Sequence, residues 1–230
     1  MRPSACAAAG CAAIWLTASG GACAQPPPGE APAIGAVSSV GDGMLAGIPL
    51  DSEYLVFVID TSGSMRQYAW DEVRQHMVET MDAYPSLQGI QVLNDEGEHM
   101  FQSYRGEWMP NTASRREAIL AALGNWNAFS DSSPREGILT AIDTYYDPEK
   151  KTSLYVYSDD FSRGSLEDSL AAISSANRTE TGQRKVRIHA VAFPVYYEVT
   201  GTLLTAANFA VLMRELCQQN GGSFIALPVR

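Results

Sequence analysis

Asp60, Ser62 and Ser64 lie within five consecutive residues, separated by Thr61 and Gly63. One carboxylate and two hydroxyls on so short a loop offer three small, hard oxygen donors that can face one point. Oxygen donors of this kind suit a cation of the size of Mg²⁺. Glycine at position 63 allows the tight bend that such a loop requires. The residue types and their spacing therefore indicate a binding site for a divalent cation.

A strand must hold this loop in place. Residues 54–59 read Tyr-Leu-Val-Phe-Val-Ile, a run too short for a helix and rich in β-branched and aromatic residues. Such a run is typical of a strand that is buried on both faces, at the centre of a parallel sheet. Asp60 then stands at the carboxyl end of the strand, which is where open α/β sheets bind their ligands.

The loop and its strand resemble the metal-ion-dependent adhesion site (MIDAS) of the von Willebrand factor type A (vWA) family, which begins with Asp-x-Ser-x-Ser. The family carries a Thr in a second loop before a helix, and Ser133 falls at that position. Its third element is an Asp after another apolar strand, usually in a Thr-Asp-Gly triplet. Here the strand is 154–157 and the triplet is Ser-Asp-Asp at 158–160, so Asp159 matches the family Asp and Asp160 replaces the glycine.

The resemblance implies a mechanism of binding. In the family, the two serines bind the cation directly, the Thr and the Asp residues bind it directly or through water, and an Asp or Glu of a partner protein fills an open position. The resemblance therefore implies an interaction or adhesion protein, not an enzyme, with Mg²⁺ or Mn²⁺ as cofactor and no catalytic residue. The implied metal ligands are Asp60, Ser62, Ser64, Ser133 and Asp159.

Two alternatives stay open at this point. A phosphohydrolase of the haloacid-dehalogenase type also places an Asp after an apolar strand, with Asp60 as nucleophile and Asp159 and Asp160 on the metal. That chemistry needs a second acid two residues after the first, and Ser62 stands there. The other alternative is an interaction scaffold with a degenerate site, because Ser133 and Asp160 depart from the family pattern. The extra charge of Asp160 could tighten cation binding or repel an acidic ligand, and it makes Asp160 a candidate partner contact.

The elements that follow the first strand alternate between strands and helices. This alternation predicts an α/β, Rossmann-like vWA fold, with a mostly parallel central sheet, one antiparallel edge strand and helices on both faces. The edge strand is expected at 99–104, as the hairpin partner of strand 89–94. Tyr196 and Tyr197 lie in a loop after strand 186–193 and are predicted to contact the partner, because aromatic residues are enriched at interfaces.

The amino terminus is predicted to be a signal peptide over residues 1–24. Arg2 precedes a small apolar run, and Ala22-Cys23-Ala24 supplies a cleavage site after Ala24. A lipid anchor at Cys23 is the alternative, although Gly20 stands where lipoproteins usually have Leu. We therefore expect an exported protein, periplasmic or extracellular, with lipid anchoring at the cell envelope as the alternative. No other segment predicts a transmembrane helix.

Composition sets the remaining expectations. Residues 25–50 are rich in Pro, Gly, Ala and Ser and are predicted to be a linker, which leaves residues 51–230 as one vWA domain. The formal net charge is −10, and loss of Arg2 makes it about −11, which disfavours nucleic acid as a partner. Cys217 is the one cysteine after the signal peptide and is expected to be a buried small hydrophobe without a disulfide.

Overall fold

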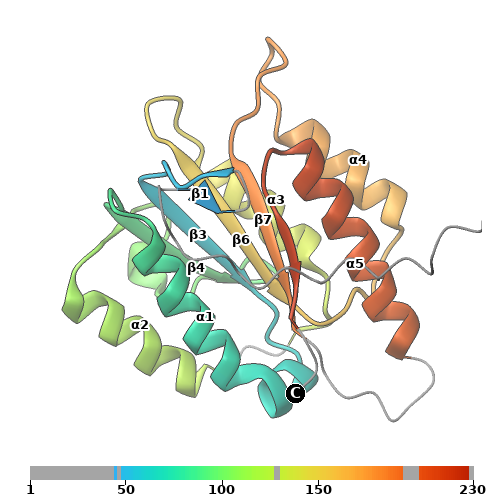
Figure 1. The fold of residues 1–230 in the computed structure, drawn as a ribbon, viewed down its shortest axis with the longest axis horizontal. Coiled ribbons are helices and arrows are strands. Elements are labelled where there is room, and N and C mark those ends of the chain that lie inside the picture. Colours follow the sequence, from blue (N-terminus) through green and yellow to red (C-terminus); the bar gives the residue numbers. More distant parts are fainter. Residues whose placement is uncertain (1–43, 46–47, 127–129, 194–201, 228–230) are drawn as a thin grey trace, which may run out of the picture. The chain divides into compact units, whose positions relative to one another are not determined.

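The computed structural model describes residues 44–45, 48–126, 130–193 and 202–227 of the 230-residue chain. Its main feature is a six-stranded sheet with the strand order β5-β4-β3-β6-β7-β8 (Figure 1). The strands are β3 (Tyr54–Ile59), β4 (Gly89–Asn94), β5 (Met109–Pro110), β6 (Thr152–Ser158), β7 (Arg187–Ala192) and β8 (Phe224–Ala226). A separate antiparallel pair comes before them, β1 (Met44–Leu45) and β2 (Ile48–Pro49).

Helices connect the strands. They are α1 (Trp70–Ala83), α2 (Ala113–Asn125), α3 (Pro134–Tyr145), α4 (Leu166–Ala176) and α5 (Thr202–Gln219). A π-helical turn, η1 (Met65–Ala69), leads into α1, and a 3-10 turn, η2 (Gln102–Tyr104), lies between β4 and β5. Within the described ranges, no helix has both the length and the apolar composition that crossing a membrane requires.

The predicted fold class is confirmed. Strands β4, β3, β6, β7 and β8 pair in parallel, and β5 pairs with β4 in the antiparallel direction. Helices α1 and α2 cover one face of the sheet, and α3, α4 and α5 cover the other (Figure 1). The parallel pairs require crossover connections, and the helices predicted between the strands supply them.

The central strand β3 is buried on both faces, as its apolar sequence predicts. Leu55, Phe57 and Ile59 belong to the core formed with α1 and α2, whereas Val56 and Val58 belong to the core formed with α3, α4 and α5. All five side chains are fully buried. Burial of this kind fixes the register of β3, because a shift by one residue would exchange the two faces. The position of the loop after Ile59 is fixed with it.

The edge strand predicted at 99–104 is wrong. Among the described residues, this segment contributes one antiparallel bridge, between Leu93 and His99, and then turns into η2. The side chain of Gln91 on β4 donates its Nε2 to the carbonyl of Tyr104 at 2.8 Å. This carbonyl is therefore bonded to a side chain and not to the backbone of a neighbouring strand. The chain therefore leaves the sheet edge and returns to it only at β5.

Two helix ends have the capping residues that are typical of such positions. The Ser165 hydroxyl accepts a hydrogen bond from the amide of Asp168 and caps α4. Helix α5 ends at Gln219, two residues before Gly221, whose φ of +65° suits a residue without a Cβ, and the Gly222 amide bonds to the Cys217 carbonyl at 2.9 Å. Cys217 is buried, which confirms its role as a small hydrophobe, and burial raises the pKa of its thiol to about 12.

Other sequence-based expectations lie outside the described residues. They include the signal peptide at 1–24, the potential anchor at Cys23 and the two partner-contact candidates, Tyr196 and Tyr197. Of the linker at 25–50, the structure describes the β1–β2 pair and Leu50, whose side chain is buried. The bounds of these segments stay predictions.

Candidate metal centre

The predicted site lies at the carboxyl edge of the sheet, between β3 and β6, where the strand order reverses. From β3 the chain adds β4 on one side and later adds β6 on the other, so the loops after β3 and β6 diverge at the carboxyl edge (Figure 1). The amide of Asp60 donates to the carbonyl of Tyr157 at 2.8 Å, which ties the start of one loop to the end of β6. Open α/β sheets bind ligands at such a switch point.

Asp60 is fully buried and its carboxylate holds three segments together. Its Oδ1 accepts hydrogen bonds from the Ser62 amide at 2.8 Å and from the Ser130 hydroxyl at 3.3 Å, and its Oδ2 accepts one from the Ser158 hydroxyl at 2.7 Å. The hydroxyls of Ser62 and Ser64 lie 3.0 Å apart. The structure therefore places the Ser62 and Ser64 hydroxyls together and bonds the Ser62 backbone to Asp60, whereas binding of a cation by these three residues stays a prediction.

A cluster of three carboxylates forms around this point. One carboxylate oxygen from each of Asp60, Asp159 and Asp160 lies within 4.8 Å of the other two. Asp159 is buried, and Asp160 is half-buried. The Thr205 hydroxyl on α5 donates to Asp160 Oδ2 at 3.1 Å, whereas Asp160 Oδ1 is buried and has no hydrogen-bond partner among the residues that the structure describes. Asp160 thus directs a carboxylate oxygen toward the cluster and stays partly exposed.

A fourth carboxylate, Asp95, follows β4 and is also fully buried. It accepts hydrogen bonds from the amides of Thr61 at 3.4 Å and Ser133 at 3.1 Å. Burial and the negative charge of Asp60 raise the pKa of Asp95 to about 7, and the same two causes raise the pKa of Asp160. The carboxylates of Asp60, Asp95 and Asp160 thus concentrate negative charge where little water can solvate it.

No protein cation in the described ranges forms an ion pair with Asp60, Asp95 or Asp160. Buried carboxylates are costly unless they are paired, hydrogen-bonded or bound to a metal. The donors here are carboxylates and hydroxyls, the oxygen ligands that Mg²⁺ and Mn²⁺ prefer. The donor set and the unpartnered Asp160 Oδ1 therefore fit a hard divalent cation.

Ser133 occupies the predicted loop but its hydroxyl has another partner. It donates to Glu136 Oε2 at 2.9 Å and makes no capping bond to α3, although Ser133 is the N-cap residue. Its amide is bonded to Asp95, so the backbone of Ser133 is fixed close to the site. Binding of a metal by the Ser133 hydroxyl stays a prediction, and donation to Glu136 leaves the lone pairs of the Ser133 oxygen available for it.

Three further residues contribute to the site and were not predicted. Asp95 and Ser158 stand at the carboxyl ends of β4 and β6, so the rule that located Asp60 could have located them too. Ser130 donates to Asp60 from a loop that carries no periodic pattern, and its sequence gives no such signal.

A shallow depression of about 420 Å³ adjoins the site through Ser130. Its other lining residues are Asp131, Ser132, Ser162 and Arg163. Ser132 has a φ of +51°, an uncommon conformation for a serine, and the Arg163 guanidinium pairs with Asp131 at 2.7 Å. Strained backbone is often found at functional sites. The depression offers polar surface beside the carboxylate cluster.

Comparisons with known proteins agree with this fold. The family model described as von Willebrand factor type A domain matches residues 55–225. A search of curated proteins gives no match. Among solved structures, a von Willebrand factor type A protein from Catenulispora acidiphila has a TM-score of 0.57 and 13% identity, over 78% of this chain and 39% of that one.

Two other structures are similar at the level of the fold. The SpRpn10 VWA domain has a TM-score of 0.50 and 11% identity, over 77% of this chain and 88% of that one. Proximal thread matrix protein 1 from the mussel byssus has a TM-score of 0.50 and 10% identity, over 77% of this chain and 43% of that one. The chain thus spans about two fifths of the Catenulispora and byssus structures.

Proposed function

The chain belongs to the von Willebrand factor type A family, and from that premise we propose that it binds Mg²⁺ or Mn²⁺ and, through the cation, an acidic side chain of a partner protein. Domains of this family generally mediate protein–protein interactions. The observation that carries the proposal is the cluster of the buried Asp60 and Asp159 with the half-buried Asp160, in the loops that also carry the paired hydroxyls of Ser62 and Ser64.

The residues of the site have separate tasks in this proposal. Ser62 and Ser64 supply neutral oxygens, while Asp60 and Asp159 supply negative charge, with Ser133 as the further predicted ligand. A bound cation would supply the positive charge that an acidic partner group needs at this edge of the sheet. Asp60 also orients the site, because its hydrogen bonds join the loops after β3 and α2 to the end of β6.

We expect the negative charge of Asp160 to favour cation binding rather than to repel an acidic partner. Its carboxylate lies in the same cluster as Asp60 and Asp159 and is held toward α5 by Thr205. Without a cation, its charge adds to that of the cluster, and burial penalises it further. A cation would relieve both effects, so we assign Asp160 to the metal centre as well as to the partner-facing surface.

The geometry favours a binding role over hydrolysis. Ser62, at the position where a phosphohydrolase of the haloacid-dehalogenase type needs an acid, carries a hydroxyl that pairs with Ser64. We therefore propose an interaction protein rather than an enzyme. From the pattern of residues 1–24 we further propose that it acts after export, in the periplasm or outside the cell.

Capture of proteins from a cell-envelope extract tests the function. We expect the immobilised full chain to retain a partner in buffer with Mg²⁺ and to release it in buffer with chelator. The amount of partner retained by Asp60→Asn should be at least about tenfold lower than that retained by the wild type. Asp71→Asn, which removes an exposed carboxylate from α1, is the matched control and should behave as the wild type.

Two results would contradict the proposal. If neither chelator nor Asp60→Asn changes the amount of partner captured, the result would favour a scaffold with a degenerate site. Turnover of a generic phosphate ester that requires Mg²⁺ and is lost in Asp60→Asn would favour the phosphohydrolase.

A further inference from the structure

A second polar pocket lies at the opposite end of the sheet, and nothing in the metal centre accounts for it. It has a volume of about 250 Å³ and is formed where the chain enters β3, β6 and β7. We name it the amino-end pocket. Five of its lining side chains are cationic, namely Lys150, Lys151, Arg184, Lys185 and Arg187.

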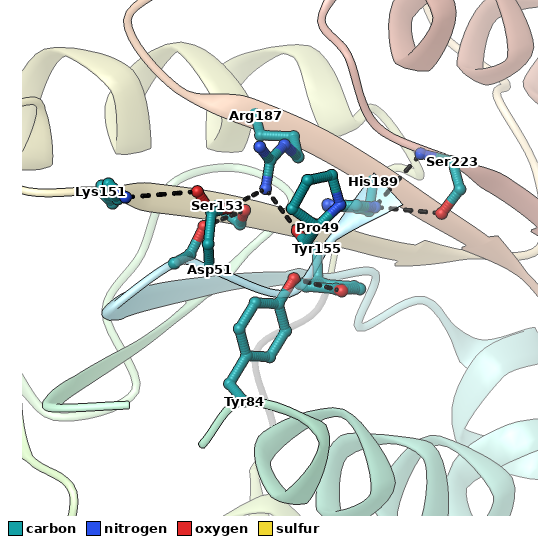
Figure 2. Close-up of polar contacts among 10 residues, drawn as sticks. Pro49, Asp51, Tyr84, Lys151, Ser153, Tyr155, Arg187, His189 and Ser223 are labelled. Atoms are coloured by element: carbon teal, nitrogen blue, oxygen red, sulfur yellow. Dashed lines mark hydrogen bonds and ion pairs between the residues drawn. The ribbon is translucent and has the colours of Figure 1, made fainter. Parts of the chain in front are cut away.

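The charge of this pocket opposes that of the whole chain, which has 16 Lys and Arg residues against 26 Asp and Glu residues. Asp51 is the one carboxylate among the lining residues, and two cations share it, Arg187 Nη1 at 2.9 Å and Lys151 Nζ at 3.4 Å. Figure 2 shows Arg187 between Asp51 and the carbonyl of Pro49. The carboxylate of Asp51 is thus already engaged by the pocket's own cations.

The other three cations of the pocket, Lys150, Arg184 and Lys185, do not pair with Asp51. Lys150 pairs with Asp147, outside the pocket. Among the described residues, no carboxylate lies within ion-pair distance of Arg184 or Lys185, and the Lys185 ammonium instead lies over the Tyr146 ring at 5.5 Å. The pocket therefore carries a surplus of positive charge.

The positive charge also acts on neighbouring groups. Burial, followed by the charges of Arg187 and Arg178, lowers the pKa of Arg184. Burial, with Arg187 and Arg184, lowers the pKa of His189 to about 3, so this imidazole is neutral and adds no charge. Figure 2 shows His189 beside Ser223, and its ring stacks on Tyr155 with centroids 4.6 Å apart. The charge thus comes from the lysines and arginines alone.

Two buried donors of lining residues have no partner in the described part of the chain. Thr152 is 5% exposed and its Oγ1 makes no hydrogen bond there, and Arg187 Nε is likewise buried without an acceptor. Buried donors are normally satisfied, so each such exception calls for an explanation. Both residues line the amino-end pocket, so an acceptor bound there would be a candidate partner for these donors.

We propose that the amino-end pocket binds a phosphate group. The surplus of cations favours an anionic ligand. The donors without a partner favour an anion that has several oxygens able to accept hydrogen bonds. Arginine and lysine are the residues that usually bind phosphate. A volume of 250 Å³ is below the range of pockets for drug-sized ligands and suits one compact tetrahedral group. The group belongs either to a small phosphate compound or to a lipid headgroup.

This site is separate from the metal centre. The pocket lies at the amino ends of β3 and β6, and the metal centre lies after their last residues. The six residues of β3 place roughly 20 Å between the two ends. The two sites can thus be tested independently, and failure of one leaves the other standing.

Titration of the full chain with inorganic phosphate, in chelator and beside NaCl of equal ionic strength, tests the proposal. We expect saturable binding by calorimetry and a rise in Tm that NaCl does not reproduce. Arg184→Gln/Lys185→Gln should weaken phosphate binding at least about tenfold, because it removes the two uncompensated cations. Arg74→Gln, which removes an exposed cation from α1, should bind as the wild type does. Equal effects of phosphate and NaCl, or unchanged affinity in the double variant, would overturn the proposal.

Thr152→Val gives a second test that does not depend on charge. Valine keeps the shape and the strand preference of threonine but removes the unpartnered hydroxyl. We expect a higher Tm than the wild type without phosphate, together with weaker phosphate binding. A lower Tm with unchanged phosphate affinity would show a purely structural threonine and contradict the assignment.

Vesicles distinguish the two sources of the phosphate group. Sedimentation with vesicles of phosphatidylglycerol and phosphatidylcholine, but not of phosphatidylcholine alone, would assign the site to a headgroup if inorganic phosphate competes and the double variant stays in solution. Binding of inorganic phosphate without sedimentation would assign it to a small phosphate compound.

Discussion

Gly137→Ala is expected to lower the free energy of unfolding by about 2–3 kcal/mol, because the new methyl group overpacks the sheet–helix interface beside the metal centre. A Cβ at this position would lie 2.6 Å from the Asn94 carbonyl oxygen, 2.7 Å from Val58 Cγ1 and 2.9 Å from the Asp95 carbonyl oxygen. Two of these atoms are backbone of the segment that carries Asp95. The Gly137 amide also donates to the Asp95 carbonyl at 2.7 Å, so α3 cannot move away without losing this bond.

Gly124→Ala in α2 is the matched control. No described residue lies within 4 Å of a Cβ placed there, and Ala is preferred to Gly within a helix by about 1 kcal/mol, so this variant should be more stable than the wild type. Urea denaturation of both variants measures the difference. Equal stabilities, or a stabilised Gly137→Ala, would show that α3 does not pack on the loop as described.

Asp95→Asn is expected to gain stability relative to the wild type as the pH rises from about 4 to about 8, in chelator. The pKa of Asp95 is raised from 3.8 to about 7 in the folded protein. Between these values the folded state holds a proton that the unfolded state has lost, so the Asp95 contribution falls with rising pH and is lost above pH 7. A shift of this size corresponds to at most about 4 kcal/mol.

The difference between the two proteins is the quantity to measure, because His189 acts in the opposite direction. Its pKa is lowered from 6.5 to about 3, so the unfolded state binds more protons between these values and stability rises with pH. The two effects partly cancel in the wild type, but His189 is common to both proteins. Chemical denaturation at several pH values gives the difference, and a constant difference across the range would contradict the raised pKa of Asp95.

The sequence predicts those parts of the site that depend on local pattern. The apolar run of β3 and the Asp-x-Ser-x-Ser spacing place Asp60, Ser62 and Ser64 together, and the apolar run of β6 places Asp159 after a neighbouring strand. Burial of β3 on both faces follows from its composition. Each of these expectations needs only short-range periodicity and the rule that ligands bind at the carboxyl ends of parallel strands.

Other parts depend on contacts between distant segments. Ser130 and Ser158 bond to Asp60 across 70 and 98 residues of sequence, and a linear pattern does not encode that distance. The edge strand was misplaced because Gln91 provides hydrogen bonds that no periodicity reveals. The amino-end pocket likewise unites Asp51, Lys151 and Arg187, which meet only when β3, β6 and β7 align.

Calorimetric titration of the full chain with Mg²⁺, and then with Mn²⁺, tests the central claim most directly. We predict saturable binding at one site by the wild type, and affinity at least about 100-fold lower in Asp60→Asn, with circular dichroism to show that both are folded. Asp71→Asn should bind as the wild type does, because its carboxylate is exposed on α1. Absence of binding by the folded wild type, or equal binding by Asp60→Asn, would contradict a metal centre formed by the carboxylates after β3 and β6.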